Sequence, residues 1–375
     1  MRLLLLSPLY PPAIGGAELQ AQRLARSLDS RGVRVTILTR SVRGAELKEN
    51  DGGIRIIRGL AGVPLGPLWG PTYMLSSYKW LQRLAGGWDI VQNQQVGLHS
   101  WVSVRVARQL RRPSILRFAS SGEGGDLGAM SKHRFGLTLV NGLRDADRFI
   151  ALTAEGALDI VRHALPPSRL VIIPNGVDLG CFKPLIWPAT AESEPMRLLF
   201  VGRLGREKGL DVLLDALAKL RGRVAVTLRV VGVGEEQERL RRQTHLAGLD
   251  EHVEFRGRRT DVVPEYAWCE LLVIPSRFEG MPNVVLEALS SGRPVLGTRV
   301  GGTAELVQPG VNGWLVPSDD ADALAEAIAR VSMQRDKLYA SGVEGRRIVE
   351  ERYSMDASAS RYINLYERLL GARSS

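Results

Sequence analysis

The sequence is poor in cysteine, in aromatic residues and in long apolar runs. Its two cysteines, Cys181 and Cys269, exclude a disulfide framework, and nothing else points to an oxidising compartment. No segment approaches the roughly 20 apolar residues that a membrane-spanning helix needs. The opening MRLLLLSPLYPP has too short an apolar core for a signal peptide, and no small-residue cleavage site follows it. We therefore expect a cytoplasmic protein.

Sequence motifs for metals and common cofactors are missing as well. There is no carboxylate cluster placed for Mg²⁺, no zinc-ligand spacing, no nucleophile elbow and no Lys-Ser/Thr phosphate loop. The five histidines have no metal-ligand partner at helical spacing; they are His99, His133, His163, His245 and His252. We therefore expect no metal and no bound cofactor.

Acidic residues are outnumbered only in the first half of the chain. Residues 1–186 contain 24 Lys and Arg against 13 Asp and Glu, and residues 187–375 contain 26 against 27, so the net charges are +11 and −1. Such an excess favours an anionic partner, such as a membrane surface, a phosphorylated acceptor or nucleic acid. The alternative is a solvated surface from an arginine-rich proteome, which the 7 lysines against 43 arginines support.

Short apolar segments alternate with helical patterns along the whole chain. Strands separated by helices are typical of parallel βαβ units, in which helices cover both faces of a sheet. The first series of expected strands comprises Leu3–Leu6, Val33–Thr39, Ile54–Ile57, Ile90–Gln92, Ser114–Phe118, Phe149–Leu152 and Leu170–Ile173. The second series comprises Arg197–Val201, Val224–Val231, Val253–Phe255, Leu271–Ile274 and Val295–Thr298.

The segment between the two series, residues 181–195, has three prolines and no periodicity, as linkers do. We predict an α/β protein with two doubly wound domains, at residues 1–182 and 196–354. A linker at residues 183–195 joins them, and a terminal helix follows at residues 355–375. Ligands of open α/β sheets bind beyond the carboxyl ends of the strands. The loops that follow strands are therefore the candidate sites.

The first of these loops contains two adjacent glycines, Gly15 and Gly16, ahead of an expected helix. Adjacent glycines let the backbone approach a ligand closely, and the N–H groups that begin a helix favour an anion such as a phosphate. The alternative is a tight turn that needs two glycines.

The loop Gly202–Gly209 follows the first strand of the second domain and carries two cations. Arg203 can bind two phosphate oxygens as a planar fork, and Lys208 adds a compact charge. Two cations on one loop suit a diphosphate leaving group. The alternative is a solvated charged turn that Glu207 partly neutralises.

The segment Pro275–Ala288 contains two carboxylates eight positions apart. Glu279 lies on a loop just past a strand, and Glu287 falls inside a helix among apolar residues. A carboxylate among apolar neighbours needs a partner, which a ribose diol could supply with two hydrogen bonds. The alternative is a surface glutamate on an amphipathic helix. The Gly280–Asn283 stretch between the two offers backbone N–H groups at a helix start.

Two further loops at strand ends are interpreted as structural. Val300–Glu305 is interpreted as a wall of the site, and its alternative is a turn in which Thr303 caps a helix. Ile173–Asp178 contains the turn signal Asn-Gly and is interpreted as mainly architectural.

These motifs, in this order, resemble glycosyltransferase family 4, the retaining nucleotide-sugar transferases of the GT-B fold. The resemblance covers nearly the whole chain, and its specific parts are Val201–Gly209, Glu279–Glu287 and Val300–Glu305. It implies two Rossmann-like domains facing across a cleft, the second binding the nucleotide and the first the acceptor, with a terminal helix that crosses back onto the first. It also implies a hexosyltransferase-type enzyme with a UDP- or GDP-linked sugar as donor.

The resemblance further assigns roles to single residues. Arg203 and Lys208 would neutralise the diphosphate as it leaves. Glu279 would contact the transferred sugar, and Glu287 would bind the ribose hydroxyls. The backbone of the remaining motif residues would hold diphosphate and sugar; these are Gly15, Gly16, Gly280, Met281, Asn283 and Val284. The catalytic residues would be Glu279, Arg203 and Lys208, without a metal, and the leaving phosphate would accept the acceptor's proton in a front-face attack that retains configuration.

One segment departs from the family pattern. Many members carry a histidine after the strand that corresponds to Ser114–Phe118, and this sequence has none there. Four residues of the glycine-rich loop that follows are candidates to contact the sugar or the acceptor instead: Ser120, Ser121, Glu123 and Asp126. The alternative is a flexible loop. The Gln92–Gln95 segment likewise stands where histidine-rich sequences often occur.

The segment Leu60–Trp88 combines several aromatic residues with Lys79 and Arg83. This combination suits a membrane interface or a lipid-linked acceptor. The alternative is a core helix with its supporting loop, since aromatic stripes are usually buried. Together with the basic first half, the segment predicts peripheral attachment to an anionic membrane surface, at the inner face of the membrane.

We therefore predict a glycosyltransferase whose acceptor is a hydroxyl of a sugar, a lipid or a small molecule, in glycolipid, polysaccharide or other glycoconjugate synthesis. Two alternatives share the architecture, namely a nucleotide-sugar epimerase and a non-catalytic nucleotide-sugar-binding protein. No acid/base constellation matches the first, and the intact cations and carboxylates count against the second. Nucleic acid is not expected as a partner, because no basic stripe with interleaved aromatics is present.

Overall fold

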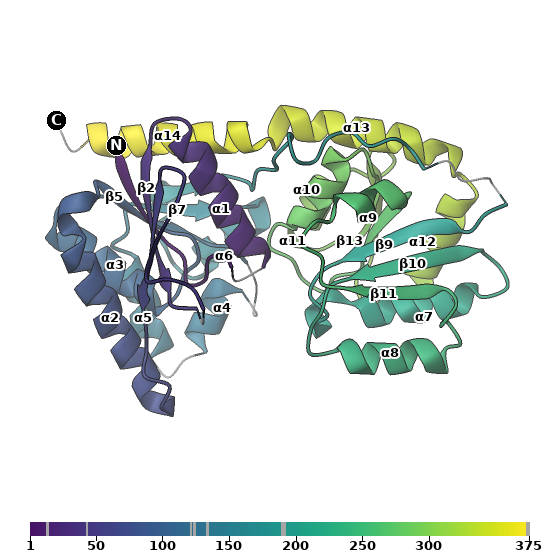
Figure 1. Cartoon of the computed structure of the whole chain (residues 1–375), viewed down its shortest axis with the longest axis horizontal. Coiled ribbons are helices and arrows are strands. Elements are labelled where there is room, and N and C mark those ends of the chain that lie inside the picture. The colour runs from purple at the N-terminus through teal and green to yellow at the C-terminus, as the bar shows by residue number, and fades with distance from the viewer. Residues whose placement is uncertain are drawn as a thin grey trace. The chain divides into compact units, whose positions relative to one another are not determined.

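The computed structural model describes residues 1–12, 15–42, 44–120, 122, 125–132, 135–188 and 193–372. The chain folds into two compact units, which are shown in Figure 1. Unit 1 consists of Met1–Gly176 together with Met355–Ser375, and unit 2 consists of Val177–Ser354. Each unit is a sheet covered by helices, which confirms the predicted α/β class with two doubly wound parts.

The boundary between the units lies between Gly176 and Val177, earlier than the predicted boundary after residue 182. The backbone N–H of Val177 donates to Tyr353 O at 2.8 Å. Ser290 Oγ donates to Phe182 O at 2.7 Å, and the Phe182 ring meets the edge of the Tyr266 ring with 6.1 Å between centroids. These contacts attach residues 177–182 to unit 2.

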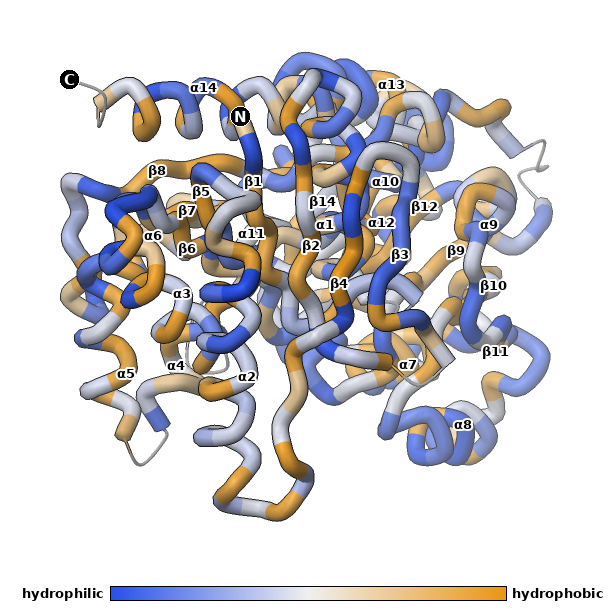
Figure 2. Tube along the Cα trace, turned by 60° about the vertical axis from the view of Figure 1, so that its left-hand side comes forward, coloured by the Kyte–Doolittle hydropathy of each residue, from blue (hydrophilic) through white to orange (hydrophobic). Residues whose placement is uncertain are grey.

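Unit 1 contains an eight-stranded sheet in the order β3-β4-β2-β1-β5-β6-β7-β8. The strands are β1 (Arg2–Leu6), β2 (Arg34–Arg40), β3 (Lys48–Asp51), β4 (Ile54–Leu60), β5 (Ile90–Asn93), β6 (Ser114–Arg117), β7 (Arg148–Ala151) and β8 (Leu170–Ile172). All neighbours are parallel except β3 and β4, which form an antiparallel hairpin. The sequence analysis did not predict β3, whose residues are polar. Figure 2 shows it as a hydrophilic strand beside the apolar β4.

Helices cover both faces of this sheet. They are α1 (Gly16–Asp29), α2 (Trp69–Arg83), α3 (Leu98–Gln109), α4 (Asp126–Ser131), α5 (Gly136–Leu143), α6 (Ala154–Arg162) and α14 (Met355–Gly371), with short 3₁₀ helices η1 (Gly66–Leu68), η2 (Ala85–Gly87) and η3 (Pro167–Arg169). Leu3 and Leu5 of β1 pack into one core with α1 and α14. Leu4 and Leu6 point to the opposite face and pack with α2 and α3. Alternate residues of one strand thus belong to different cores, as in a sheet buried on both faces.

Unit 2 contains a six-stranded sheet in the order β11-β10-β9-β12-β13-β14, in which every neighbouring pair is parallel. The strands are β9 (Met196–Val201), β10 (Val226–Val231), β11 (Val253–Gly257), β12 (Leu271–Ile274), β13 (Val295–Thr298) and β14 (Gly313–Val316). This is the order 3-2-1-4-5-6 of a doubly wound nucleotide-binding sheet. The direction of winding reverses between β9 and β12, so the loops after these two strands flank the switch point where such sheets bind ligands.

The helices of unit 2 are α7 (Leu210–Leu220), α8 (Gln237–Leu246), α9 (Val263–Trp268), α10 (Asn283–Ser290), α11 (Gly301–Leu306), α12 (Ala321–Ser332) and α13 (Asp336–Arg352), with a 3₁₀ turn η4 (Arg206–Lys208). Leu198 and Phe200 of β9 pack with α7 and α12 in the main core. Helix α8 is mostly hydrophilic in Figure 2, and only Leu240 and Thr244 of its side chains are buried. Among the described residues, no helix is both long and apolar enough to cross a membrane.

Candidate functional site

The loops after β9 and β12 meet at the switch point of unit 2. The two strands are paired, with Leu198 opposite Leu271, so their carboxyl ends adjoin. The backbone N–H of Arg277, in the loop after β12, donates to Glu207 O in the loop after β9 at 2.8 Å. The cations and the first carboxylate that the sequence singles out therefore lie on two loops in direct contact.

Lys208 and Glu279 form an ion pair across these loops. Lys208 Nζ lies 2.6 Å from Glu279 Oε1, and Ser276 Oγ donates to the same oxygen at 2.7 Å. The side chains of Glu279 and Lys208 are 9% and 26% exposed. Two donors hold the carboxylate in one orientation, while the ammonium keeps a solvent-accessible side. A ligand phosphate can reach that side, because an ammonium has three N–H donors.

Arg203 occupies a more open position on the first loop. Its side chain is 62% exposed, and its guanidinium pairs with Glu207 four residues on and lies 3.7 Å from Glu235. Exposed pairs of this kind contribute little to stability. Arg203 is therefore able to exchange its carboxylate partners for a phosphate, which matches its planar fork equally well.

Close backbone contacts hold the Glu279 loop from both sides, and they require glycine. Gly209, with φ of +66°, lies where a Cβ would come 1.9 Å from Pro275 O. Gly301, with φ of +43°, lies where a Cβ would come 1.8 Å from Glu279 O. Any side chain at either position would push the loop away, and both backbones are left-handed, which favours glycine. The glycines of the two neighbouring loops thus fix where Glu279 stands.

Glu287 is buried in α10, with 6% of its surface exposed, so the alternative of a surface glutamate is wrong. Tyr266 Oη in α9 donates to Glu287 Oε2 at 3.2 Å. A buried carboxylate is stable only with hydrogen-bond donors, and the tyrosine supplies one. The sequence analysis missed Tyr266, because it lies 21 positions away on a different helix.

The start of α10 follows the Glu279 loop directly. Pro282 is the residue before the helix, Met281 is buried, and Asn283 and Val284 are half-buried. Gly280 O accepts the N–H of Gly302 at 2.8 Å. The first turn of the helix thus presents its backbone N–H groups beside Glu279, an arrangement that favours a phosphate or a sugar oxygen.

The start of α11 does not have the helix cap at Thr303 that the sequence analysis considered as an alternative. The helix begins at Gly301 after Val300, and Thr303 is fully buried inside its first turn. Capping by Thr303 is therefore wrong. A Cβ on Gly302 would lie 2.5 Å from Gly280 O, so the helix start packs directly on the Glu279 loop. This contact gives the segment the structural role that its position after a strand suggests.

In unit 1, Gly15 and Gly16 stand at the start of α1, as the sequence predicts. Gly15 is the extended residue before the helix, and Gly16 is its first residue. Glu18 lies in the first turn, and burial raises the pKa of its carboxyl. The preceding loop is held by Arg58, a residue that the sequence analysis missed. Its Nη2 donates to Pro11 O at 2.6 Å and pairs with Glu49 at 2.7 Å.

The loop after β6 contains the residues proposed for acceptor contact. Asp126 accepts hydrogen bonds from Ala119 N at 2.6 Å and from Ser120 Oγ at 3.2 Å. Burial raises the pKa of the Asp126 carboxyl. These bonds give Asp126 and Ser120 a part in shaping the loop, and their contact with a ligand stays a prediction. Ser121 and Glu123 lie outside the described residues.

A buried polar network runs beneath the same end of the unit 1 sheet. Arg117 Nη1 donates to Gln94 O at 2.9 Å, and its Nη2 donates to Asn175 Oδ1 at 2.5 Å. Tyr366 Oη of α14 donates to Gln92 Oε1 at 2.7 Å. The Gln92–Gln95 segment and the Asn175 turn thus serve the interior of unit 1. The sequence shows them only as separate polar residues.

The described histidines and acidic residues are spread through the two units. Within the described ranges, no three His, Cys, Asp or Glu side chains come together in a way that could hold a metal ion. His99 is buried beside Tyr73, and its Nε2 lies 3.1 Å from Gln95 O. Burial lowers the pKa of His99 to about 4, so its imidazole is neutral near pH 7.

Comparison with known protein families decides the family. The model of the glycosyl transferase 4-like domain matches residues 15–176, and the model described as glycosyl transferases group 1 matches residues 195–334. The chain belongs to the group 1 glycosyltransferases. This confirms the family and the enzyme class that the motif order predicts.

Relatives of this glycosyltransferase resemble it over nearly their full lengths. The GDP-mannose-dependent alpha-(1-6)-phosphatidylinositol monomannoside mannosyltransferase of Mycobacterium tuberculosis is 28% identical, over 96% of either chain. Sucrose-phosphate synthase from Thermosynechococcus elongatus has a structure that matches with a TM-score of 0.85 and 24% identity, over 99% of each chain. The structure of Anabaena HepE with UDP-glucose matches with a TM-score of 0.77 and 22% identity, over 97% of this chain and 99% of that one. The structural likenesses confirm the predicted GT-B fold class.

Proposed function

We propose that this glycosyltransferase moves a hexose from a nucleoside-diphosphate sugar to an acceptor hydroxyl with retention of configuration. The observation that carries the proposal is the Lys208–Glu279 pair at the switch point of unit 2, followed directly by the helix that contains the buried Glu287. Two loops in contact thus bring together a cation for a diphosphate, a carboxylate for sugar hydroxyls and, on the helix that follows, a second carboxylate for a ribose diol.

Each group has a task in the proposed reaction. As the bond between the sugar and the diphosphate breaks, the electron pair goes to the diphosphate oxygen and the sugar becomes oxocarbenium-like. Lys208 and Arg203 stabilise the developing negative charge without a metal. Glu279 binds hydroxyls of the transferred sugar. The acceptor oxygen attacks from the side of the leaving group, and its proton passes to the departing phosphate, which gives retention.

The donor is proposed to be a UDP- or GDP-linked sugar, and Glu287 its ribose contact. Two similar proteins support testing both bases. The mycobacterial relative is named as dependent on GDP-mannose, and the HepE structure contains UDP-glucose. In this chain the loops after β10 and β11 begin at Gly232 and just past Gly257, beside the loop after β9. We propose that the backbone of these loops contacts the base.

The acceptor is proposed to be a hydroxyl of a sugar, a lipid or a small molecule, reached at a membrane surface. Support comes from apolar side chains that unit 1 exposes near η1 and α2. Leu65 and Leu68 are 63% and 54% exposed, and Val63 and Leu75 are exposed as well. Aromatic residues of the same segment, such as Trp88 and Tyr73, are buried, so its inner side is core. The basic first half adds attraction to anionic lipids.

Titration calorimetry without metal tests the donor site. UDP, GDP and ADP are titrated into the wild type, Glu287→Gln and Glu287→Ala, with Glu326→Ala on the exposed face of α12 as control. We expect one of the first two nucleotides to bind the wild type and the control equally, and both Glu287 variants at least tenfold more weakly. Binding that ignores Glu287 would contradict the assignment.

Product analysis and flotation test the other parts. Sugar donors of the bound nucleotide are incubated with candidate acceptors, and the anomeric configuration of the product is read by NMR. Conversion of the donor without any acceptor would replace transfer by epimerisation.

For the membrane, the protein is floated with anionic and neutral liposomes, and Leu65→Ser/Leu68→Ser is compared. We expect salt-sensitive binding to anionic liposomes only, weakened in the variant, and equal flotation would contradict the membrane proposal.

A further inference from the structure

The Glu279 loop depends on its neighbours for its position. It connects the end of β12 at Ile274 to the start of α10 at Asn283, and it contains Pro275 and Pro282, which have no N–H to donate. Its backbone bonds to other elements include Arg277 N to Glu207 O and Gly302 N to Gly280 O, both 2.8 Å. A third bond, from Thr298 Oγ1 to Ser276 O at 2.5 Å, ties the loop to β13.

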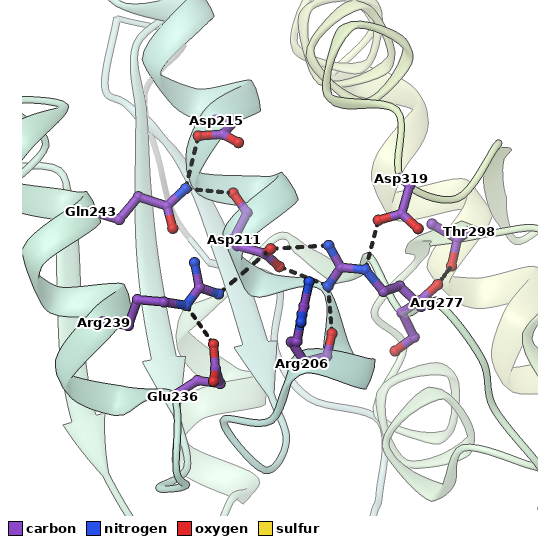
Figure 3. A network of polar contacts seen from close by, with 10 residues as sticks. Arg206, Asp211, Asp215, Glu236, Arg239, Gln243, Arg277, Thr298 and Asp319 are labelled. Atoms are coloured by element: carbon purple, nitrogen blue, oxygen red, sulfur yellow. Dashed lines mark hydrogen bonds and ion pairs between the residues drawn. The ribbon is translucent and has the colours of Figure 1, made fainter. Parts of the chain in front are cut away.

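Arg277 adds a side-chain attachment two residues before Glu279. Its Nη1 and Nη2 donate to the two carboxylate oxygens of Asp211 at 2.9 and 3.0 Å, and its Nε lies 2.7 Å from Asp319. Nη1 also donates to Arg206 O. Figure 3 shows the guanidinium between Asp211 at the start of α7 and Asp319 beyond β14. Four of the five N–H groups of an arginine are thus engaged with protein groups, which leaves little for a ligand.

The partners of Arg277 lie around Lys208. Arg206 belongs to the same 3₁₀ turn as Lys208, and Asp211 lies in the helix that begins directly after Gly209. A guanidinium that bonds to both sides of Lys208 therefore connects the two members of the Lys208–Glu279 pair. Because a bidentate pair fixes orientation as well as distance, this connection is rigid.

Electrostatics keep the Arg277–Asp211 pair charged. Burial raises the pKa of the Asp211 carboxyl, but the hydrogen bonds and the charge of Arg277, together with the charge of Arg239, outweigh it and lower the pKa below its usual value. The hydrogen bond to Asp211 in turn raises the pKa of Arg277. Helix α8 supports the pair, since Arg239 lies 3.6 Å from Asp211 and Gln243 donates to Asp211 O at 3.0 Å.

We propose that Arg277 and Asp211 are positioning residues that set the place of Glu279 relative to Lys208. The inference rests on the proposed function and adds residues to its site. The two side chains act through the orientation of Glu279, which contacts the sugar, whereas the nucleotide is held mainly by other groups: Glu287 at the ribose, and Arg203 and the N–H groups at the start of α10 at the diphosphate. The pair therefore governs the rate of sugar transfer and leaves nucleotide affinity nearly unchanged.

The test separates rate from binding. Arg277→Ala, Arg277→Lys, Asp211→Asn and the double variant Arg277→Ala/Asp211→Asn are compared with the wild type for kcat, KM and the Kd of the nucleoside diphosphate. Lys219→Ala is the control, because it removes an exposed ion pair, with Asp322, from the same helix α7. A displacement of about 1 Å at a reacting group can cost about 100-fold in rate.

We expect Arg277→Ala to lower kcat about 30- to 100-fold with Kd changed less than threefold. Arg277→Lys, which keeps the charge without the fork, should recover part of the loss. The double variant should be no slower than Arg277→Ala alone, because both substitutions break one connection. The control should retain wild-type kcat.

Three results would overturn the inference: kcat of Arg277→Ala within twofold of wild type, equal losses in kcat and in nucleotide affinity, or multiplicative losses in the double variant. Urea unfolding of each variant shows whether it is folded, and Arg277→Lys and Asp211→Asn preserve the test if Arg277→Ala is not. A wild type that binds no nucleotide would contradict the proposed function instead, so the two failures are distinguishable.

Discussion

The two units share a winding order but differ in what they place at the carboxyl ends of their central strands. In unit 2 the switch point has charged side chains near solvent, with Lys208 and Glu279 paired at 2.6 Å. In unit 1 strand β5, next to the switch point, ends in neutral amides, and Gln92 and Gln94 are almost fully buried. The Gln92 amide accepts a hydrogen bond from Tyr366 and donates one to Gln94 Oε1, and the backbone carbonyl of Gln94 accepts one from Arg117.

This difference shows how one architecture serves two purposes. A shared strand order fixes where a ligand can lie, and the side chains decide whether it can be bound. In unit 2 the half-exposed charges can exchange partners with a ligand. In unit 1 the Gln92 amide and the two oxygens of Gln94 already have partners in the interior, so we expect the loops beyond them to carry recognition. The predictions below test this contrast, from the largest expected effect to the smallest.

Removing the cation of the unit 2 pair should have the largest effect. We expect Lys208→Ala to lower the rate of transfer by about 10²- to 10³-fold, because it removes a group that stabilises the leaving diphosphate. The matched control is Lys219→Ala, which lies on the next helix, and steady-state kinetics with saturating donor is the measurement. A rate within fivefold of wild type would assign the charge of Lys208 a structural role only.

Adding a side chain at Gly301, which packs against the Glu279 backbone, should destabilise unit 2 strongly. We expect Gly301→Ala to cost more than ~3 kcal/mol, because strain at positive φ adds to a clash with Glu279 O. The control in unit 1 is Gly52→Ala, which also has positive φ, +62°, but has open space around the added Cβ. It should cost only about 1–2 kcal/mol. Equal losses in urea unfolding would show that the contact does not hold the loop.

Low pH should lower the folding stability of unit 1, because His99 is buried in its neutral form. The unfolded histidine binds a proton below its usual pKa near 6.5, whereas the folded one does so only below about 4. Stability is therefore complete above pH 6.5 and falls as the pH drops towards 4, by up to ~3 kcal/mol. Hydrogen exchange of β5 and α3 against pH measures it, and His99→Gln should flatten the dependence. An unchanged slope in the variant would place the titration elsewhere.

The smallest expected effect is the difference between removing the hydroxyl of Tyr266 in unit 2 and that of Tyr366 in unit 1. Tyr266→Phe removes a donor to Glu287, and Tyr366→Phe removes a donor to Gln92. We expect each to cost about 1–2 kcal/mol of stability. Only Tyr266→Phe should also weaken nucleotide binding, about threefold, because the Tyr266 hydroxyl orients Glu287, the proposed contact of the ribose. The same affinity loss in both variants, measured by calorimetry, would remove the distinction between the units at this level.

Much of the fold follows from the pattern of apolar segments. Every strand expected from such a segment is present, because parallel strands buried on both faces need continuous apolar residues. Two strands were missed. The residues of β3 are polar, and β3 is stabilised by its antiparallel pairing with β4 at the sheet edge. The short β14, with Gly313 at its start, gives too weak a periodic signal.

The site was predictable where its residues are neighbours in sequence, and much less so where they are not. Adjacent positions and strand-end loops identify Lys208, Glu279 and Glu287. The partner of Arg277, by contrast, lies 66 positions away in helix α7, and nothing in the local sequence distinguishes Asp211 from other first-turn carboxylates. The boundary after Gly176 was missed for the same reason, since hydrogen bonds to distant helices decide it.

The division of the chain into units also determines the order in which their cores can be completed during synthesis. Unit 2 is continuous in sequence, from Val177 to Ser354, so all of its residues have been made before α14 begins. Unit 1 is not, because Tyr362 and Tyr366 of α14 form part of its core beside α1. The core of unit 1, most of which is translated before unit 2, therefore cannot close until α14 has left the ribosome. A chain that ends prematurely within α14 retains a complete unit 2 and an open unit 1.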